Sequence, residues 1–150
     1  MDVHPAILYY PDPDHPGWFA WDLPKDGRFH ETLGKLLVRA EGKGRGRCRM
    51  FPDARHANLG GVMHGGAILT FIDMALFAAG RAAGAQTARA VTLDCTAQFI
   101  APGRLGVPLD AEVELLRETG RLAFFRGKIV QDDILVAAFS GTLRKTSAPA

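Results

Sequence analysis

The most apolar part of the chain lies between residues 67 and 79, where only Thr70 and Asp73 are polar. Gly65 and Gly66 precede this stretch, and another glycine follows it. A helix that is apolar on nearly every side is enclosed by other elements of a protein. We therefore predict one long buried helix here, and we consider it too short and too closely flanked by glycines to span a bilayer.

Five segments alternate between apolar and polar residues with a period of two, which is typical of strands with one buried face. They are residues 35–50, 90–101, 108–117, 122–131 and 134–145. The simplest architecture that buries all of these faces is an antiparallel sheet with one side on the helix. The predicted fold class is therefore α+β, with an antiparallel β-sheet wrapped around one long central α-helix.

Two of these segments carry a further prediction about their faces. In residues 90–101, the alternation places Val91, Leu93, Cys95, Ala97 and Phe99 on one face and Thr92, Asp94, Thr96 and Gln98 on the other. In residues 35–50, interpreted as one strand, the basic residues Lys43, Arg45, Arg47 and Arg49 share a face. We interpret this basic face as a solvated surface in preference to a phosphate-binding site.

Asp73 is unusual in the predicted helix, because it places a carboxylate among apolar residues. Leu69 and Leu76 lie one turn away and shield this carboxylate from water. Desolvation makes a carboxylate a stronger base, which is what proton abstraction from water requires. Alternatively, Asp73 bonds a neighbouring backbone group or forms a buried ion pair. The helix start favours the first interpretation, since Gly65 and Gly66 leave its first N–H groups open to a carbonyl oxygen that becomes negative.

The spacing of these groups predicts a dimer. Gly65 and Asp73 are eight residues apart, roughly 12 Å along a helix axis, which is too far for both to reach one carbonyl carbon. If two copies of the helix ran antiparallel across a twofold axis near Leu69, Gly65 of one copy would lie beside Asp73 of the other. We therefore expect an obligate homodimer with two identical sites, and we leave open whether two dimers associate into a homotetramer.

This combination of motifs resembles a known family. Asn58, His64-Gly65-Gly66 and Asp73, followed by the strand AVTLDCTAQFIAPGRLG, are similar to the motifs of the hotdog-fold acyl-CoA thioesterases. The similarity covers roughly residues 35–145 and is to the phenylacetic-acid-degradation type (PaaI-like) branch of the 4-hydroxybenzoyl-CoA thioesterase superfamily. It implies the hotdog fold and the hydrolysis of an aryl-acyl or medium-chain acyl-CoA thioester. It implies no cofactor, because coenzyme A is part of the substrate.

The resemblance also implies roles for individual residues. The N–H of Gly65 is expected to polarise the thioester carbonyl, and Asp73 is expected to act as general base or nucleophile. Asn58 would help to orient the reacting groups, and His64 accompanies the glycine turn. The hydroxyl group of Thr92 would hold water or substrate.

A coenzyme A thioester needs basic groups at the mouth of its site and apolar walls inside. Expected contacts with the nucleotide end are Pro102, Arg104, Arg117, Gly120 and Arg121, although each arginine taken singly also fits an ordinary surface charge. Expected contacts near the acyl end are Gly66, Leu69, Thr70 and Met74. The residue types do not select one acyl group.

Two alternative functions stay open. One is a non-catalytic acyl-CoA-binding or sensing module that retains the cleft. The other is a hotdog hydratase or dehydratase that acts on acyl thioesters, although that chemistry favours a histidine above the acyl β-carbon, and the motif does not place His64 there.

The composition bounds the remaining possibilities. With 150 residues, of which 47% are hydrophobic and 23% charged, the chain is expected to form one globular domain at residues 34–147, preceded by an arm at residues 1–33. The formal net charge of +2 is too small to indicate a nucleic-acid partner. The N-terminus has no pattern of a leader peptide, so we expect a cytoplasmic protein without a membrane partner. Cys48 and Cys95 are expected to be buried free thiols.

The arm is expected to lack regular structure, because its five prolines interrupt every possible element and PDPDHPG reads as a series of turns. Its aromatic residues Trp18, Phe19 and Trp21 are expected to pack over the domain edge or a partner subunit, in preference to lining an acyl pocket.

No metal site is predicted. Asp12, Asp14 and His15 lie close together in the sequence, but they belong to a loose loop that offers no fourth ligand. His56 and His64 lack the spacing of a zinc site, and no cysteine accompanies them.

Overall fold

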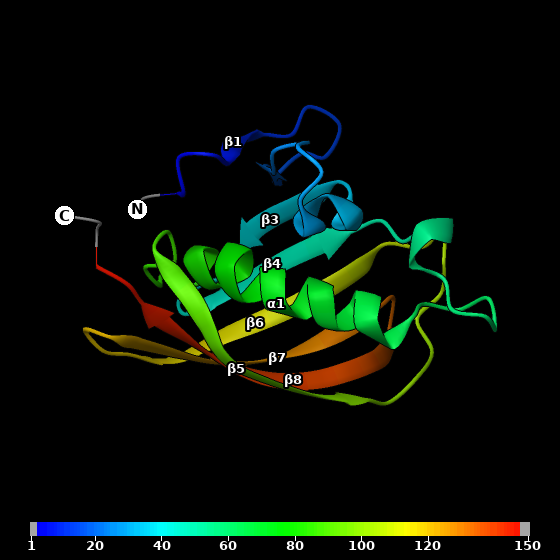
Figure 1. The fold of residues 1–150 in the computed structure, drawn as a ribbon. Helices are drawn as coiled ribbons and strands as arrows, with labels where there is room; N and C mark the ends of the chain where they lie inside the picture. The colour runs from blue at the N-terminus through cyan, green and yellow to red at the C-terminus, as the bar shows by residue number, and fades with distance from the viewer. Residues whose placement is uncertain (1–2, 148–150) are drawn as a thin grey trace.

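The computed structural model describes residues 3–147 and wraps an antiparallel sheet around one long helix (Figure 1). Its elements in chain order are β1 (Leu8–Pro11), β2 (Phe19–Asp22), the 3-10 helix η1 (Phe29–Leu33), β3 (Leu36–Ala40), β4 (Arg45–Met50), the 3-10 helix η2 (Ala54–His56), α1 (Gly65–Ala82), β5 (Ala90–Phe99), β6 (Leu109–Glu118), β7 (Leu122–Gln131) and β8 (Ile134–Lys145). The strand order is β1-β2-β3-β4-β6-β7-β8-β5, so β1 and β5 are the two edges of the sheet. The predicted α+β architecture is confirmed.

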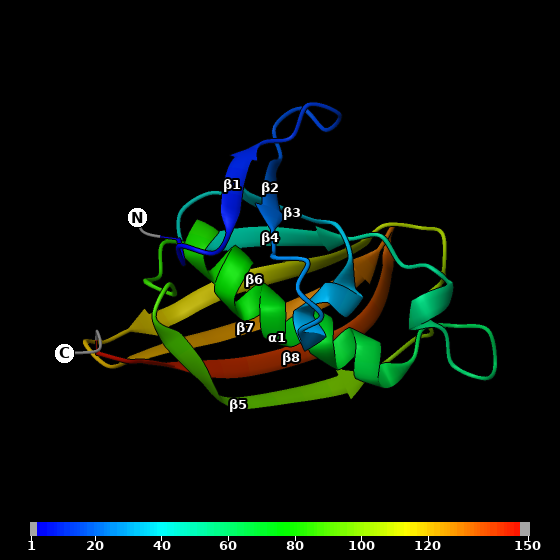
Figure 2. The ribbon, with the colours of Figure 1, turned by 45° about the horizontal axis from the view of Figure 1, so that its top comes forward.

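α1 crosses the concave face of the sheet, as the two views in Figures 1 and 2 show. Its buried side chains recur at spacings of three and four residues and include Ile68, Phe71, Ile72, Ala75, Leu76 and Ala79. The helix comes so close to β4 that a Cβ at Gly46 would collide with the carbonyl oxygen of Ala79. The missing side chain at Gly46 therefore determines how deeply α1 sits in the sheet.

The length of α1 requires a correction. The helix has 18 residues with a mean hydropathy of 1.3, so by length and composition alone it could cross a membrane. The expectation that it is too short is therefore wrong. Its packing is the better guide, because eight of its residues are buried within the fold, as is typical of the core helix of a globular domain.

The N-terminal arm contains regular elements, so the expectation that its prolines exclude them is wrong. β1 and β2 form an antiparallel hairpin, and the proline-rich sequence of residues 11–17 forms its turn, as predicted for that segment. β2 pairs in turn with β3, where Phe19 lies opposite Val38 and Ala20 opposite Leu37. The hairpin therefore extends the main sheet.

The arm tryptophans are buried by different neighbours. Trp18 is 6% exposed and lies beneath two guanidinium groups, with Arg39 at 4.3 Å and Arg49 at 4.6 Å from its ring centre. Trp21 is 2% exposed and packs into the hydrophobic core. Packing over the domain edge thus describes Trp18, whereas Trp21 belongs to the interior.

The basic segment of residues 35–50 forms a hairpin, so the prediction of a single strand is wrong. β3 and β4 pair antiparallel, and the turn between them contains Gly42 and Gly44 with φ angles of 98° and 73°. Positive φ angles favour glycine, which explains why this turn forms within an alternating sequence. Lys43 therefore lies in the turn and not on a strand face.

Arg47 and Arg49 do share one face of β4, but this face is not simply solvated as we expected. Both guanidinium groups bind the carboxylate of Asp110 on β6, at 2.9 Å from Arg47 and 2.6 Å from Arg49. Asp110 is only 5% exposed, and its hydrogen bond to Arg49 raises the pKa of that arginine. The charges of this face are thus largely compensated, which also disfavours a phosphate site here.

A β-bulge changes the predicted faces of β5. The register with β8 shifts between Thr92 and Asp94, so that Leu93 is an extra residue. Cys95, Ala97 and Phe99 lie on the helix side after the shift, but Thr92 lies on that side before it. Val91 and Leu93 are 50% and 57% exposed. The prediction that all five apolar residues share one face is therefore wrong for Val91 and Leu93.

Candidate active site

The site begins where the loop after η2 turns into α1. His64 is the N-cap residue of α1, and its Nδ1 accepts a hydrogen bond of 2.8 Å from the backbone N–H of Gly66. Nδ1 can accept this bond only if it carries no proton, which places the proton of a neutral His64 on Nε2. His64 therefore occupies the Gly66 N–H and stabilises the first turn of the helix.

Gly65 keeps its N–H open. Among residues 3–147, no acceptor binds this group, which is the first N–H of α1. A Cβ at Gly65 would lie 3.5 Å from the ring of Phe99, an ordinary contact distance, so this ring lies directly beside the turn. Phe99 was not predicted as a site residue, because the alternation of β5 places it on the apolar face but does not show which part of α1 it contacts.

Asp73 lies two turns further along α1 and is paired with a hydroxyl group. Thr92 Oγ1 donates a hydrogen bond of 2.5 Å to Oδ1 of Asp73. Asp73 is half-buried, in agreement with the expectation that water is partly removed from it. Cys95 is also half-buried and free, and its burial, assisted by the charge of Asp73, raises the pKa of its thiol. Cys48 is fully buried, as predicted.

Asn58 shapes the turn that leads to His64. Its side-chain Oδ1 accepts hydrogen bonds from the N–H groups of Gly60 at 2.8 Å and Val62 at 3.2 Å. The carbonyl oxygen of the Asn58 side chain therefore folds back on its own loop, as is common for asparagine in turns. A role in orienting the reacting groups stays a prediction for its amide nitrogen.

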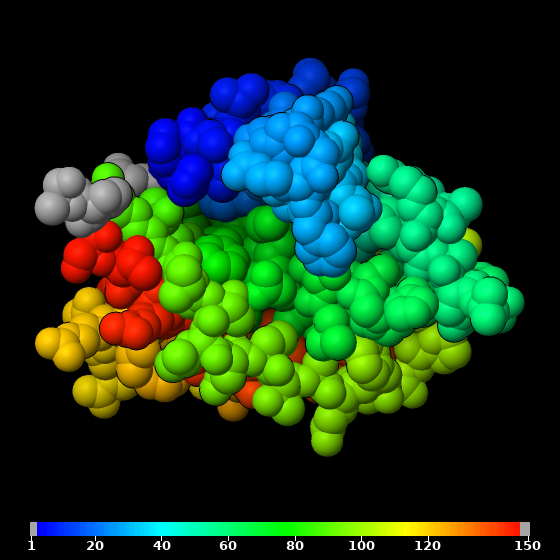
Figure 3. Space-filling view, in the orientation of Figure 1, coloured from blue at the N-terminus to red at the C-terminus, as the bar shows by residue number. Residues whose placement is uncertain are grey.

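One chain does not bring its two key groups together. Gly65 and Asp73 lie on the same helix, about 12 Å apart along the axis, as its rise per residue requires. Several large apolar side chains of α1 and β5 are exposed: Leu69, Val91, Leu93 and Phe99 are between 40% and 57% exposed, with Val91 and Leu93 on the face of β5 that points away from α1. Figure 3 shows α1 in green between the blue arm and the yellow-green β5.

The residues expected to bind substrate fall into separate groups. Leu69 is 40% exposed on α1, and the Thr70 hydroxyl group donates a hydrogen bond to the backbone oxygen of Gly66. Met74 is half-buried and forms part of the wall of an apolar cavity of about 210 Å³.

The expected nucleotide contacts are divided between the two ends of the sheet. Pro102 and Arg104 lie in the loop after β5, next to the start of α1, where Met63 N–H donates to the carbonyl oxygen of Gly103. Arg117 and Arg121 flank the turn between β6 and β7, at the opposite end of the molecule (Figure 1). Gly120 lies within that same turn. Within one chain the structure does not bring these two groups together.

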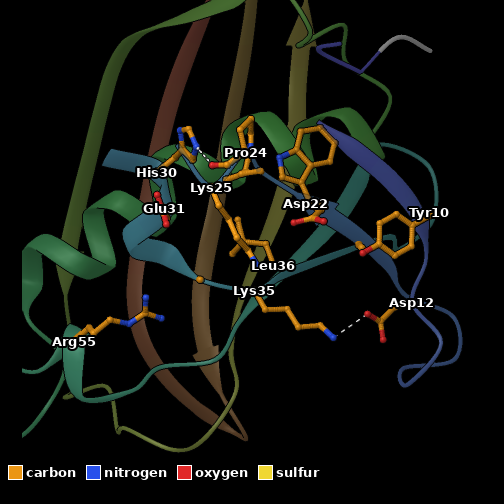
Figure 4. Close-up of a pocket in the computed structure, with 14 residues that line it drawn as sticks. Tyr10, Asp12, Asp22, Pro24, Lys25, His30, Glu31, Lys35, Leu36 and Arg55 are labelled. Carbon is orange, nitrogen blue, oxygen red and sulfur yellow. Dashed lines mark hydrogen bonds and ion pairs between the residues drawn. The ribbon is translucent and has the colours of Figure 1, made fainter. Parts of the chain in front are cut away.

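A separate cleft of about 440 Å³ lies on the arm and contains none of the predicted site residues (Figure 4). Lys35 Nζ lies 2.9 Å from Asp12 Oδ2 at its rim, and His30 Nε2 donates to the carbonyl oxygen of Pro24 at 2.7 Å. These contacts hold the arm together, and we assign them no catalytic role.

Metal-ligating side chains do not gather in the part of the chain that the structure describes. Residues 3–147 contain no group of three or more histidine, cysteine or acidic side chains that could hold a metal ion. Asp12 instead binds His15 Nδ1 at 2.8 Å as well as Lys35.

The fold indicates a class of protein. An antiparallel sheet wrapped around one long helix is the hotdog fold. Residues 60–138, just over half of the chain, match the model of the thioesterase superfamily. The chain therefore belongs to the thioesterase superfamily.

Curated relatives and solved structures agree with this family. Human acyl-coenzyme A thioesterase 13 is 28% identical over 106 residues, which cover 68% of this chain and 72% of the relative. A variant of the phenylacetic acid degradation protein PaaI from Thermus thermophilus is 30% identical with a TM-score of 0.65, covering 79% of this chain and 98% of that chain. The chain is thus similar to this PaaI protein over most of its length.

More distant structures share the fold. The PaaI protein of E. coli is 24% identical with a TM-score of 0.67, covering 79% of this chain and 83% of that chain. A hypothetical thioesterase from Streptococcus pneumoniae, solved with coenzyme A, is 17% identical with a TM-score of 0.67, covering 79% of this chain and 94% of that chain.

Proposed function

We propose that this protein hydrolyses an acyl-CoA thioester to a free acid and coenzyme A. The observation that carries this proposal is the hydrogen bond from Thr92 of β5 to Asp73 of α1 inside a hotdog fold, with the open N–H of Gly65 at the start of the same helix as Asp73. Relatives named acyl-coenzyme A thioesterase, and a neighbour of the same fold solved with coenzyme A, support the choice of substrate.

Thioester hydrolysis requires a hydrogen-bond donor at the carbonyl oxygen and a base or nucleophile near the carbonyl carbon. In the proposed mechanism, the Gly65 N–H donates a hydrogen bond to the thioester oxygen, and the helix N-terminus stabilises the negative charge that develops there. Asp73 then removes a proton from water as the water oxygen attacks the carbon, or attacks the carbon itself. Collapse of the intermediate breaks the C–S bond and releases coenzyme A as a thiolate, which needs little help from an acid. When water attacks, this step gives the free acid directly. When Asp73 attacks, it gives an acyl anhydride of Asp73, which water then hydrolyses to the free acid and the Asp73 carboxylate.

Two copies of the chain complete each site in this proposal. β5 is an unpaired edge strand, and it carries exposed apolar side chains at Val91 and Leu93. A long apolar edge is a ready surface for pairing with another strand. Antiparallel pairing of β5 with its copy would place two α1 helices side by side, so that Gly65 of one chain faces Asp73 of the other.

The nucleotide end of coenzyme A would bind at arginines whose side chains are exposed to solvent. Arg117 and Arg121 are exposed and form no ion pair with any of residues 3–147. Arg104 pairs with Asp132 at 2.9 Å, but both side chains are largely exposed, and such pairs contribute little to stability. Phosphate groups could therefore displace Asp132 from Arg104. Because the two groups lie at opposite ends of the sheet, they serve one coenzyme A only if different subunits supply them.

The direct test is thiol release from a panel of acyl-CoAs that includes phenylacetyl, hydroxybenzoyl and medium-chain thioesters. Asp73→Asn should lower kcat by about 10²-fold or more, as expected for loss of a general base. Asp94→Asn, an exposed acid on the same strand as Thr92, is the matched control and should keep the wild-type rate. Wild-type kinetics for Asp73→Asn would refute the mechanism.

The same panel separates the two alternative functions. Tight binding of an acyl-CoA without thiol release would favour a sensing module. Addition or removal of water at an enoyl-CoA, with the thioester intact, would favour a hydratase or dehydratase.

A further inference from the structure

We propose that the N-terminal arm closes the acyl pocket of this enzyme and limits it to an acyl end about the size of one aromatic ring. This inference rests on the thioesterase function proposed above and identifies the part of the chain that selects the substrate.

The pocket is the cavity of about 210 Å³ between the arm, α1 and the start of β5. The arm supplies Ile7, Trp21 and Leu23, and α1 supplies Met74 and Phe77. Ala90, the first residue of β5, forms part of the remaining wall. The lining is almost entirely apolar, as an acyl group requires.

The cavity adjoins the reactive pair. Met74 follows Asp73 directly in α1, and Ala90 lies two residues before Thr92 on the same side of β5. Residues two apart on a strand are neighbours on one face. A thioester carbonyl held at Asp73 would therefore have its acyl group at the mouth of this cavity.

The size of the cavity restricts its occupant. A buried apolar cavity of about 150 Å³ is known to accept benzene. The pocket here is open to solvent on one side, and its volume of about 210 Å³ suits a phenyl-sized or short branched acyl end that enters from that side. A long acyl chain would require the arm to move away.

Several contacts hold the arm against the rest of the domain, so the arm forms a fixed wall of the pocket. β2 pairs with β3, Lys35 binds Asp12 at 2.9 Å, and the guanidinium group of Arg81 at the end of α1 lies 4.6 Å from the ring centre of Tyr9. The match to the thioesterase model covers residues 60–138 and does not include the arm.

Two variants of the full-length protein test the inference by changing the volume of the pocket in opposite directions. Ala90→Leu fills the cavity and should lower the ratio of kcat/KM for phenylacetyl-CoA to that for acetyl-CoA by roughly 10-fold or more. Leu23→Ala enlarges it and should shift the preferred acyl group towards longer chains. Trp18→Phe changes a buried aromatic residue of the same arm outside the cavity and should leave the acyl preference unchanged.

A binding measurement keeps this test independent of hydrolysis. In Trp18→Phe protein, Trp21 is the remaining tryptophan, and its fluorescence should change on titration with phenylacetamide. Adding Ala90→Leu should abolish the change, while the thermal midpoint shows whether this variant folds. If Ala90→Leu does not fold, Ala88→Val at the same wall replaces it.

The outcomes distinguish the two proposals. An unchanged acyl preference in both cavity variants, with active enzyme, would overturn the pocket assignment and leave the thioesterase function intact. If no acyl-CoA is hydrolysed at all, the proposed function fails. Loss of the phenylacetamide signal in the filled variant would then still support a binding cavity under the arm, and persistence of that signal would exclude it.

Discussion

Thr92 on β5 reaches Asp73 on α1 through a hydrogen bond of 2.5 Å, and it does so because a β-bulge at Leu93 reverses the phase of the strand. Without the extra residue, the inward positions of Cys95, Ala97 and Phe99 would continue to Leu93, and Thr92 would point outward. The bulge thus turns Thr92, which would otherwise point outward, towards Asp73, the proposed general base or nucleophile.

Thr92→Val should lower kcat by removing the group that holds Asp73 in place. A hydrogen bond to a charged group contributes about 1.5–3 kcal/mol, so a loss of roughly 10- to 100-fold is expected if the bond serves the transition state. Thr96→Val is the control, because Thr96 is exposed on the outer face of the same strand. Steady-state kinetics with the preferred acyl-CoA provide the measurement. Equal rates for both variants would show that Thr92 has no catalytic role.

Gly65→Pro should remove the proposed oxyanion donor without disturbing the helix. Proline is tolerated at the first helical position, and the preceding His64 has ψ of 134°, which proline accepts in the residue before it. Loss of one such donor typically costs about 10²- to 10³-fold in kcat. Gly65→Ala adds a side chain of similar position but keeps the N–H, and it should retain at least roughly 10-fold more activity than Gly65→Pro. Similar activities for the two variants would argue against the donor role.

Leu93→Asp should separate the subunits, because it would place a charge on the apolar edge through which we expect the chains to pair. Leu8→Asp is the matched control at the opposite edge of the sheet, where Leu8 is 62% exposed on β1. Light scattering should give half the wild-type mass for Leu93→Asp and the wild-type mass for Leu8→Asp. Thiol release should fall only in the first variant. A monomeric wild-type protein would contradict the proposal of a shared site.

Acid should loosen the arm through Asp12. Lys35, and then His15, lower the pKa of this carboxyl group from 3.8 to about 2. Because the pKa is lower in the folded state, the stabilisation is present above the unfolded value and is lost as the pH falls from about 4 towards 2. Tryptophan fluorescence should report a transition in this range. Asp12→Asn should remove that transition, and Asp14→Asn, at an exposed neighbouring acid, should retain it.

The sequence predicted those parts of the fold that depend on periodicity. The long apolar run of α1 and the alternating segments of β6, β7 and β8 bury their apolar residues through local patterns, so they could be recognised without neighbours. The turn between β3 and β4 also had a visible signal, since Gly42 and Gly44 interrupt the basic alternation. The signal was outweighed by the regular spacing of arginines beside it.

Other parts depend on contacts that a local pattern does not contain. β1 and β2 form because they pair with each other and because β2 pairs with β3. This pairing outweighs the tendency of the neighbouring prolines to interrupt strands. The bulge at Leu93 follows from the register between β5 and β8, and the position of Phe99 beside Gly65 follows from the same pairing. The sequence motif nominates site residues along the chain, but the contacts between them could be seen only in the tertiary structure.

The central claim, that two chains share each site, is tested most directly by complementation. Gly65→Pro and Asp73→Asn chains carrying different tags can be co-expressed, and the heterodimer can be isolated on both tags. Each heterodimer would contain one complete site and one site that lacks both groups, so we expect about half of the wild-type activity, although either variant alone is nearly inactive. A heterodimer that is as inactive as its two parents would show that each chain uses its own Gly65 and Asp73, and it would contradict the shared site.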